Sequence, residues 1–262
     1  MTTIRSENAE FQILRALKQS RSKRNQMREI VIEGIECIKQ ALAAEWEITR
    51  IITANAAKLS GWAKAMLETQ QQAGLVEMKK ELYDSLCDKT VPSELFVTAR
   101  IKDKAPPEAD LPPDPFILVL DRPGDFGNLG SMIRSANAFR VDAVFIMGHG
   151  VDIYEPKVIR ASLGSIFHTN IGRIESVEKL TGIIKDRGME VIGTDSAGSV
   201  SLAEHRLERP VMIIMGNEAK GMSIRLRELC GTIVRIPLSG EVNSLNVSCA
   251  ASIVLWEVYK NR

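Results

Sequence analysis

The sequence predicts an α/β protein made of two domains. Short stretches rich in Val and Ile alternate with helical patterns along the chain, which indicates α/β units on largely parallel sheets. A stretch at residues 102–115 holds five of the ten prolines, and proline disrupts helix interiors and central strands alike. We therefore place a linker at residues 105–115, between a domain of residues 1–104 and a domain of residues 116–262.

The first domain is expected to open with a helix, because apolar residues recur at helical spacing across residues 10–19. A strand at residues 29–34 ends in glycine. The alternation then continues with a helix at 35–44, a strand at 48–54, a helix around 62–72 and a strand at 74–80.

The second domain is expected to begin with a buried strand, because residues 116–121 ("FILVLD") form an almost continuous apolar run. A glycine-rich turn and a helix at 129–139 follow it. The pattern predicts further strands at 141–148, 190–195 and 210–216, with helices between them, and an apolar helix close to the end of the chain.

The bulk composition is that of an ordinary globular protein, with a net charge of +1 and 45% hydrophobic residues. It lacks the basic excess of a non-specific nucleic-acid coat protein. The closest two of the four cysteines are 19 residues apart, so no metal-ligand spacing or disulfide framework is predicted. Neither a signal peptide nor a membrane-length apolar run is found. We expect a cytoplasmic protein without a metal or a membrane partner.

Three stretches rich in glycine, serine and asparagine follow predicted strands, at residues 121–139, 212–223 and 236–257. Ligands of open α/β sheets bind outside the carboxyl ends of the strands, where all three stretches lie. Ser244, Asn246 and Ser248 can cap the last helix, and their number beyond a single cap indicates a polar ligand as well.

Each stretch alone is more typical of a structural turn than of a ligand site, because glycine turns after strands are common in α/β proteins. "GDFGNLG" is not a dinucleotide fingerprint, since its glycines are three residues apart. The three histidines lie far apart and accompany no nucleophile motif. The combination of three such stretches at strand ends nevertheless favours a binding site.

The stretches "NLGSMIRSANAF", "IIMGNEAKGMS" and "IPLSGEVNSLNVSCAASIVLWE" resemble, in order and spacing, the three motifs of the SpoU/TrmH family of RNA ribose 2′-O-methyltransferases, within the SPOUT superfamily. This resemblance covers residues 116–262. The first domain, with a basic helix end before "REIVIEGIECIKQAL", resembles the small RNA-binding domain of many members, which is similar to a ribosomal-protein fold.

The resemblance implies a C-terminal SPOUT α/β domain with a deep trefoil knot, although knots are nearly absent from proteins in general. It also implies a homodimer, S-adenosylmethionine as the cofactor, and no metal. The residues that it implies for cofactor binding are Thr194, Gly216, Asn217, Gly221, Ile236, Leu238, Ser244, Leu245 and Asn246. The residues that it implies for catalysis are Asn128, Arg134 and Glu218.

The implied reaction is transfer of a methyl group from S-adenosylmethionine to a ribose 2′-hydroxyl of RNA, with ribosomal RNA favoured over transfer RNA. Since a guanidinium resists deprotonation, we expect Arg134 to hold a phosphate and stabilise the developing alkoxide. Whether it also takes the proton stays open.

Two segments are candidates for contact with RNA. Residues 11–28 contain six basic residues and no acidic one, and there we expect Arg21 and Arg24 to contact phosphates. The alternative is that this basic segment is the solvent-exposed end of a helix and binds no RNA. In "KVIRASLGSIF" we expect Arg160 and Ser162 to contact RNA.

Two departures from the family pattern, Arg140 and the pair Phe126-Gly127, concern turn geometry and touch no motif residue. Two other functions remain open. One is a catalytically inactive RNA-binding member of the same fold, against which the intact Arg134, Glu218 and Asn246 argue. The other is a nucleotide-dependent oxidoreductase, against which the missing glycine fingerprint argues.

Overall fold

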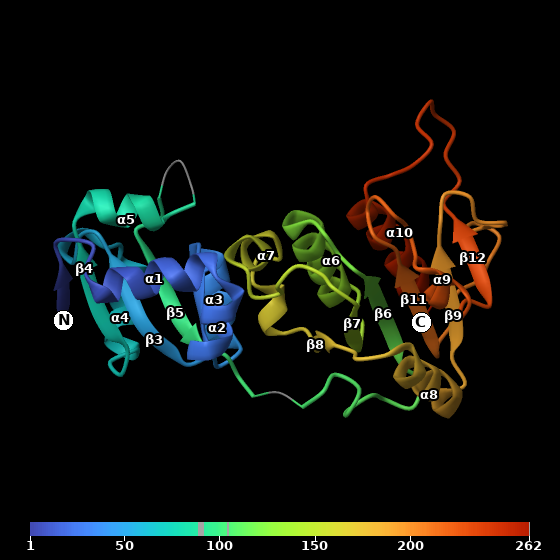
Figure 1. The fold of residues 1–262 in the computed structure, drawn as a ribbon, viewed down its shortest axis with the longest axis horizontal. Coiled ribbons are helices and arrows are strands. Elements are labelled where there is room, and N and C mark those ends of the chain that lie inside the picture. Colours follow the sequence, from blue (N-terminus) through green and yellow to red (C-terminus); the bar gives the residue numbers. More distant parts are fainter. Residues whose placement is uncertain (89–91, 104, 262) are drawn as a thin grey trace. The chain divides into compact units, whose positions relative to one another are not determined.

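The computed structural model describes residues 1–88, 92–103 and 105–261, which form two compact units (Figure 1). The first unit comprises Met1–Asp103 together with Asp152–Phe167, and the second comprises Lys104–Val151 and His168–Arg262. The first unit thus also includes Asp152–Phe167, a segment that was expected in the second domain. Residue 104, where the predicted first domain ends, lies outside the described residues.

The first unit contains a five-stranded mixed sheet with the strand order β1-β4-β3-β5-β2. β1, β4 and β3 are parallel to one another, whereas β5 pairs antiparallel with both β3 and β2. The strands are β1 (Thr2–Ile4), β2 (Glu29–Glu33), β3 (Ile48–Thr53), β4 (Gly74–Met78) and β5 (Leu95–Arg100). The helices are α1 (Ala9–Gln19), α2 (Arg21–Met27), α3 (Ile35–Ala43), the 3₁₀ turn η1 (Ala56–Lys58), α4 (Gly61–Thr69), α5 (Lys80–Leu86), α7 (Pro156–Ala161) and the 3₁₀ turn η2 (Ser165–Phe167).

The segment Asp152–Phe167 joins the first unit because it covers the edge of this sheet. β2 is an edge strand, yet all of its residues are buried, and α7 packs against it. The indole of Trp46 makes edge-on contacts with the rings of Tyr154 and Phe167, at centroid distances of 6.0 and 5.0 Å. An uncovered edge strand would offer its unpaired backbone groups to other chains.

The second unit contains a seven-stranded sheet in which every pair is parallel, in the order β10-β12-β9-β11-β6-β7-β8. The strands are β6 (Phe116–Asp121), β7 (Ala143–Met147), β8 (Ile171–Arg173), β9 (Glu190–Thr194), β10 (Val200–Ser201), β11 (Val211–Met215) and β12 (Thr232–Arg235). The helices are α6 (Phe126–Ala138), α8 (Val177–Arg187), α9 (Ile224–Arg227) and α10 (Val247–Lys260).

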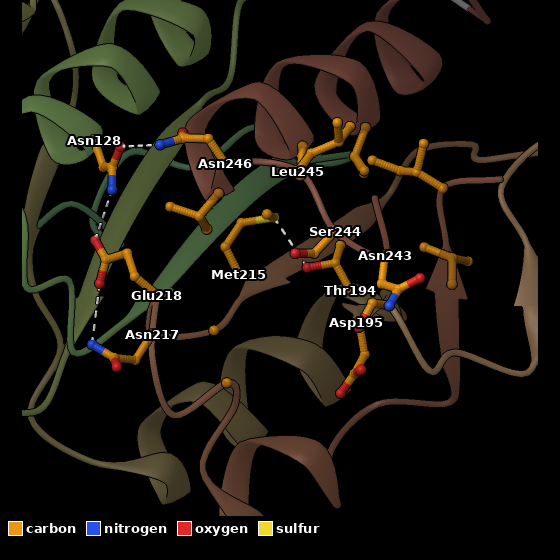
Figure 2. A pocket seen from close by; sticks show the side chains of 18 of the residues that line it. Asn128, Thr194, Asp195, Met215, Asn217, Glu218, Asn243, Ser244, Leu245 and Asn246 are labelled. Atoms are coloured by element: carbon orange, nitrogen blue, oxygen red, sulfur yellow. Dashed lines mark hydrogen bonds between the residues drawn. The ribbon is translucent and has the colours of Figure 1, made fainter. Parts of the chain in front are cut away.

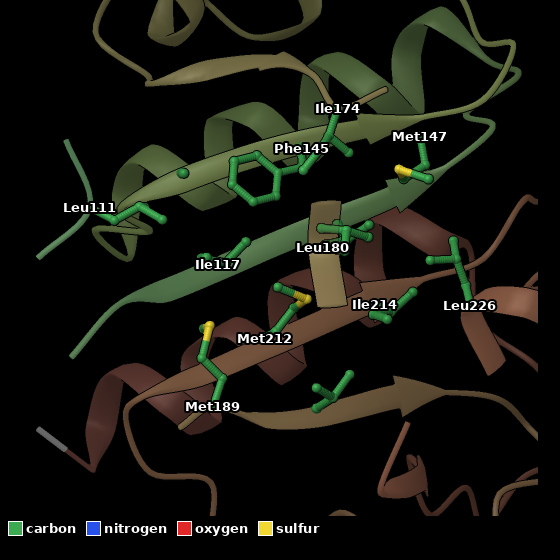
Figure 3. Packing of buried hydrophobic residues seen from close by; sticks show 13 residues of the cluster. Leu111, Ile117, Phe145, Met147, Ile174, Leu180, Met189, Met212, Ile214 and Leu226 are labelled. Atoms are coloured by element: carbon green, nitrogen blue, oxygen red, sulfur yellow. The ribbon is translucent and has the colours of Figure 1, made fainter. Parts of the chain in front are cut away.

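The core of the second unit lies on both faces of its sheet, which explains why β11 is apolar and buried along its whole length, and why β6 is buried throughout and apolar up to Leu120. Leu180 of α8 and Leu226 of α9 pack onto one face, against residues such as Ile117 and Ile214 (Figure 3). On α6 and α10, which pack together, the hydroxyls of Ser135 and Ser252 share a hydrogen bond of 2.7 Å. The sheet thus has a layer of helices on each side.

Most strand and helix predictions are confirmed to within two or three residues. The helix expected at 129–139 begins earlier, at Phe126, because the Asp125 carboxylate accepts a hydrogen bond from the Asn128 N–H (2.7 Å) and caps it. The sequence patterns did not predict the shorter elements, among them β1, α2, β8 and β10. No described helix is long and apolar enough to cross a membrane.

Candidate functional site

The candidate site is a cavity of about 440 Å³ in the second unit (Figure 2). Every residue predicted to bind the cofactor lines it: Thr194, Gly216, Asn217, Gly221, Ile236, Leu238, Ser244, Leu245 and Asn246. Asn128 and Glu218, predicted as catalytic, line it too. The structure therefore brings together three stretches that are far apart in the sequence.

Three neighbouring parallel strands form the floor of the cavity. Thr194 ends β9, Met215 ends β11, and Val234 lies near the end of β12. The carboxyl ends of parallel strands meet at one edge of a sheet, where ligands of such folds bind. The Thr194 hydroxyl donates a hydrogen bond to the Ile214 carbonyl (3.2 Å), which fixes this side chain across the two strands.

The turn after β11, residues 216–221, forms one wall and is closed by two hydrogen bonds between the backbones of Asn217 and Gly221 (3.0 and 2.9 Å). A Cβ at Gly216 would lie only 2.5 Å from Gly221 backbone atoms, so a side chain cannot be accommodated there. Gly221 has φ +64°, a conformation that favours glycine. Both glycines are therefore dictated by the shape of the turn.

Glu218 connects this turn to the turn before α6. Its Oε2 accepts a hydrogen bond from the Gly124 N–H (3.1 Å). Its Oε1 accepts from the Asp125 N–H (3.3 Å) and, at 3.5 Å, from the Asn128 side-chain amide. Both carboxylate oxygens are thus occupied by donors of the protein, which suits a residue that orients the two turns.

Asn246 connects the start of α10 to the same network. Its Oδ1 accepts hydrogen bonds from the N–H (2.8 Å) and the hydroxyl (2.6 Å) of Ser248 and so caps α10. Its Nδ2 donates to Asn128 Oδ1 (2.9 Å). Figure 2 shows the resulting chain from Asn246 through Asn128 to Glu218, which spans all three predicted stretches.

Arg134 is exposed on α6 and does not line the cavity. Within the described residues, no ion pair or hydrogen bond is seen for its guanidinium. The side chain is therefore available to an external anion, which leaves its predicted role open to test.

Several residues that line the cavity were not predicted from the sequence. Asp195 is the most informative, because it is a carboxylate that directly follows the predicted Thr194. Hydrogen bonds from the Ala197 N–H (2.9 Å) and the Arg227 guanidinium (2.7 Å) hold the pKa of Asp195 below its usual range. The other missed lining residues are Ser196, Met215, Val234, Asn243, Val247, Ala250 and Val254.

In the first unit, Arg21 is exposed, whereas Arg24 is only 1% exposed. The Arg24 guanidinium donates hydrogen bonds to Asp152 (2.8 Å) and Glu155 (2.7 Å) within that unit. A charge that is buried and paired in this way cannot contact RNA. The prediction that Arg24 binds RNA is corrected on that ground, and Arg21 stays a candidate.

The second pair of predicted RNA contacts also lies in the first unit. Ser162 is completely buried, and its hydroxyl donates to the Ile159 carbonyl (2.8 Å), so the prediction for Ser162 is wrong. Arg160 is half-buried and forms ion pairs with Asp88 (3.4 Å) and Glu33 (3.8 Å). These pairs fasten α7 to the unit, and the contact of Arg160 with RNA stays a prediction.

No group of three or more metal-ligating side chains is found among the described residues. All four cysteines are free thiols.

Residues 115–256 match the model of the SpoU rRNA Methylase family, and residues 8–96 match the SpoU L30e-like domain. Among curated proteins, the 23S rRNA (uridine(2479)-2′-O)-methyltransferase of Streptomyces viridochromogenes is 32% identical over 99% of this chain and 92% of its own. A putative TrmH family tRNA/rRNA methyltransferase of Staphylococcus saprophyticus is 30% identical, over 90% of this chain and 97% of its own.

Two solved structures extend the likeness to the fold. The SpoU methyltransferase AviRb of Streptomyces viridochromogenes in complex with AdoMet has a TM-score of 0.89 at 30% identity, over 97% of this chain and 98% of its own. An AdoMet-bound rRNA methyltransferase of Sinorhizobium meliloti has a TM-score of 0.83 at 25% identity, over 99% of this chain and 98% of its own. The chain belongs to the SpoU rRNA Methylase family.

Proposed function

We propose that this protein transfers a methyl group from S-adenosylmethionine to a ribose 2′-hydroxyl of RNA, with ribosomal RNA as the favoured substrate. The observation that carries the proposal is the convergence of three distant stretches on one cavity at the carboxyl ends of β9, β11 and β12. The Streptomyces relative named for 2′-O-methylation of 23S rRNA supports both the reaction and the class of RNA.

The cavity fits the proposed cofactor in size and chemistry. A volume of about 440 Å³ lies within the range of roughly 300–1,000 Å³ that small-molecule sites occupy. Apolar side chains such as Met215 and Leu245 can cover a nucleoside, and Asn243 and Ser244 offer hydrogen bonds beside them. The AdoMet-bound structure of AviRb supports the same ligand.

When bound, the cofactor supplies an electrophilic methyl group, so the protein has to place a ribose hydroxyl in line with it and stabilise the charge that develops. We assign the stabilisation of that negative charge to the exposed guanidinium of Arg134, which can bind an adjacent phosphate and stabilise the alkoxide. Asn128 and Glu218 hold the two turns of the site together and are assigned to positioning.

We also propose the trefoil knot and the homodimer for this chain. The knot is supported by the path after β12. The chain leaves an outer part of the sheet, lines the cavity over β9 and β11 with residues 236–246, and returns as α10 against α6. A segment that crosses neighbouring strands in this way is what a threaded C-terminus requires.

The homodimer is supported by the outer face of α10. Ile253 and Trp256 are 37% and 45% exposed, and the Trp256 ring lies 5.9 Å from Phe139 and 5.8 Å from Tyr259. Clustered exposed apolar side chains mark interaction surfaces. Sedimentation velocity should show a dimer that Trp256→Glu dissociates, whereas a monomer at micromolar concentration would exclude this proposal.

The proposed reaction is tested by calorimetry and single-turnover methylation. We expect about one S-adenosylmethionine per chain, competition by S-adenosylhomocysteine, and methylation of RNA but not of its 2′-deoxy counterpart. Cofactor binding without methylation of ribosomal or transfer RNA would favour an inactive RNA-binding member of the family. Absence of cofactor binding would refute the proposal, and mapping of 2′-O-methyl marks with and without the gene identifies the RNA.

A further inference from the structure

We infer that Asp121 and Arg122 form a clamp that positions the turn of residues 216–221 and thereby sets affinity for the cofactor. The inference rests on the proposed function in that this turn is taken as a wall of the S-adenosylmethionine pocket. Both residues open the glycine-rich stretch 121–139, but they precede the motif "NLGSMIRSANAF" that carries the family resemblance, and neither is among the residues that the resemblance implies for the site.

The clamp starts from a buried carboxylate at the end of β6. Asp121 is only 3% exposed, and its two oxygens accept hydrogen bonds from Nε and Nη2 of Arg122, both at 2.9 Å. Asp121 Oδ2 also accepts from the Ser223 N–H (2.6 Å), just beyond the turn. One carboxylate therefore holds both the guanidinium and the backbone that leaves the turn.

Arg122 reaches the turn with its side chain and its backbone. Its Nη2 donates to the Gly221 carbonyl (3.2 Å), and its own carbonyl accepts from Asn217 Nδ2 (2.8 Å). Asn217 and Gly221 are the two ends of the turn and both line the cavity. The clamp thus grips the turn at both ends.

The backbone around Arg122 is built for this contact. Arg122 has φ +50°, a left-handed conformation that costs energy for a residue with a side chain. A Cβ at Gly148 would lie 2.9 Å from Arg122 Cγ, so the absence of a side chain there makes room for the arginine. The contacts that Arg122 makes with Asp121 and with the turn must offset this strain. They therefore hold the Arg122 side chain in place and do not leave it free in solvent.

The turn has few other supports. Ala219 and Lys220 are exposed, and apart from the Asn217–Gly221 pair only Glu218 and the clamp tie the turn to its surroundings among the hydrogen bonds described. A looser turn would have to be ordered when the cofactor binds, which lowers affinity. Arg134 lies on α6, outside this turn, so we expect the chemical step to change less than the affinity for the cofactor.

The test compares Arg122→Lys and Asp121→Asn with Arg209→Lys. Arg209 pairs with Asp142 and donates to the Asp114 carbonyl (2.7 Å) at the opposite, amino end of β6, where Asp142 also accepts from the Phe116 N–H (2.7 Å). The control therefore removes a similar arginine–aspartate contact of the same unit, but far along the strand from the cavity.

For Arg122→Lys we expect Kd and KM for S-adenosylmethionine to rise by about tenfold, with kcat within about twofold of the unaltered protein. Arg209→Lys should leave Kd and KM unchanged and lower only the melting temperature. An unchanged Kd in both clamp variants, or a fall in kcat without a change in Kd, would overturn the inference.

Hydrogen exchange of the cofactor-free protein separates this inference from the proposed function. The amides of Gly221 and Ser223 should exchange faster in Arg122→Lys and not in Arg209→Lys. If the unaltered protein binds no S-adenosylmethionine, the proposed function fails, while faster exchange still supports the clamp. Equal exchange in all variants would exclude it whatever the ligand.

Discussion

Replacing Asn246 with alanine or aspartate separates two roles that the structure gives to one side chain. Asn246→Ala removes the cap of α10, which is worth about 0.5–2 kcal/mol. It also removes the 2.9 Å hydrogen bond to Asn128. At about 2–4 °C per kcal/mol for a domain of this size, the melting temperature should fall by a few degrees. Cofactor affinity should fall as well.

Asn246→Asp keeps an oxygen for the Ser248 N–H, and a negative charge suits the start of a helix, so stability should stay close to that of the unaltered protein. The aspartate lacks the side-chain N–H that donates a hydrogen bond to Asn128 Oδ1 in the unaltered protein. Asn128 must then rotate to offer its own amide, and it gives up its contact with Glu218. The loss of about 0.5–1.5 kcal/mol corresponds to a roughly 2- to 13-fold weaker cofactor affinity or slower turnover.

Thermal unfolding and calorimetry with S-adenosylmethionine measure the two effects separately. Ser176→Ala is the matched control, because Ser176 caps α8 through the Lys179 N–H (3.3 Å) and does not line the cavity. It should lower stability and leave affinity unchanged. An Asn246→Asp protein as unstable as Asn246→Ala would refute the capping argument, and one with normal affinity and turnover would refute the link through Asn128.

Three further outcomes are expected. Arg134→Ala should lower single-turnover methylation by roughly a hundredfold while cofactor affinity and melting temperature hold, and near-normal turnover would remove Arg134 from the catalytic residues. Arg24→Met should lower the free energy of unfolding, measured in urea, by about 3–5 kcal/mol, because it leaves two largely buried carboxylates without their partner. Arg21→Met should leave stability unchanged and weaken RNA binding. In the Trp256→Glu variant, which should be monomeric, a thiol reagent at neutral pH should modify exposed Cys249 before Cys230, because burial raises the pKa of the Cys230 thiol to about 11, and equal rates would contradict this.

The sequence predicted best what depends on local pattern. The runs at 116–120 and 211–215 are apolar throughout because both faces of the sheet are covered, and such runs have few alternatives to a buried strand. The three stretches of the site could be found because a small residue directly after an apolar run is visible in the sequence, as at Gly216. Asp195 could not be identified in this way, since an aspartate after a strand is typical of any turn.

What could not be predicted depends on tertiary contacts. Arg21 and Arg24 have the same chemistry and lie three residues apart, yet one is exposed and the other is buried against Asp152 and Glu155. Their difference arises from a partner segment more than a hundred residues away along the chain. The antiparallel pairing of β5 with β2 and β3 is likewise decided by the packing of the whole sheet.

The position of Asp152–Phe167 limits how this protein can be recombined with its relatives. The chain enters the second unit after residue 103, returns to the first at 152, and leaves it again after 167. In a chimera that exchanged only residues 1–103, the native α7 would have to pack against the β2 of a relative. Asp152 and Glu155 would also face a residue of the relative in place of Arg24. The two pieces therefore have to be inherited together, so the unit of exchange in this family member is discontinuous in the gene.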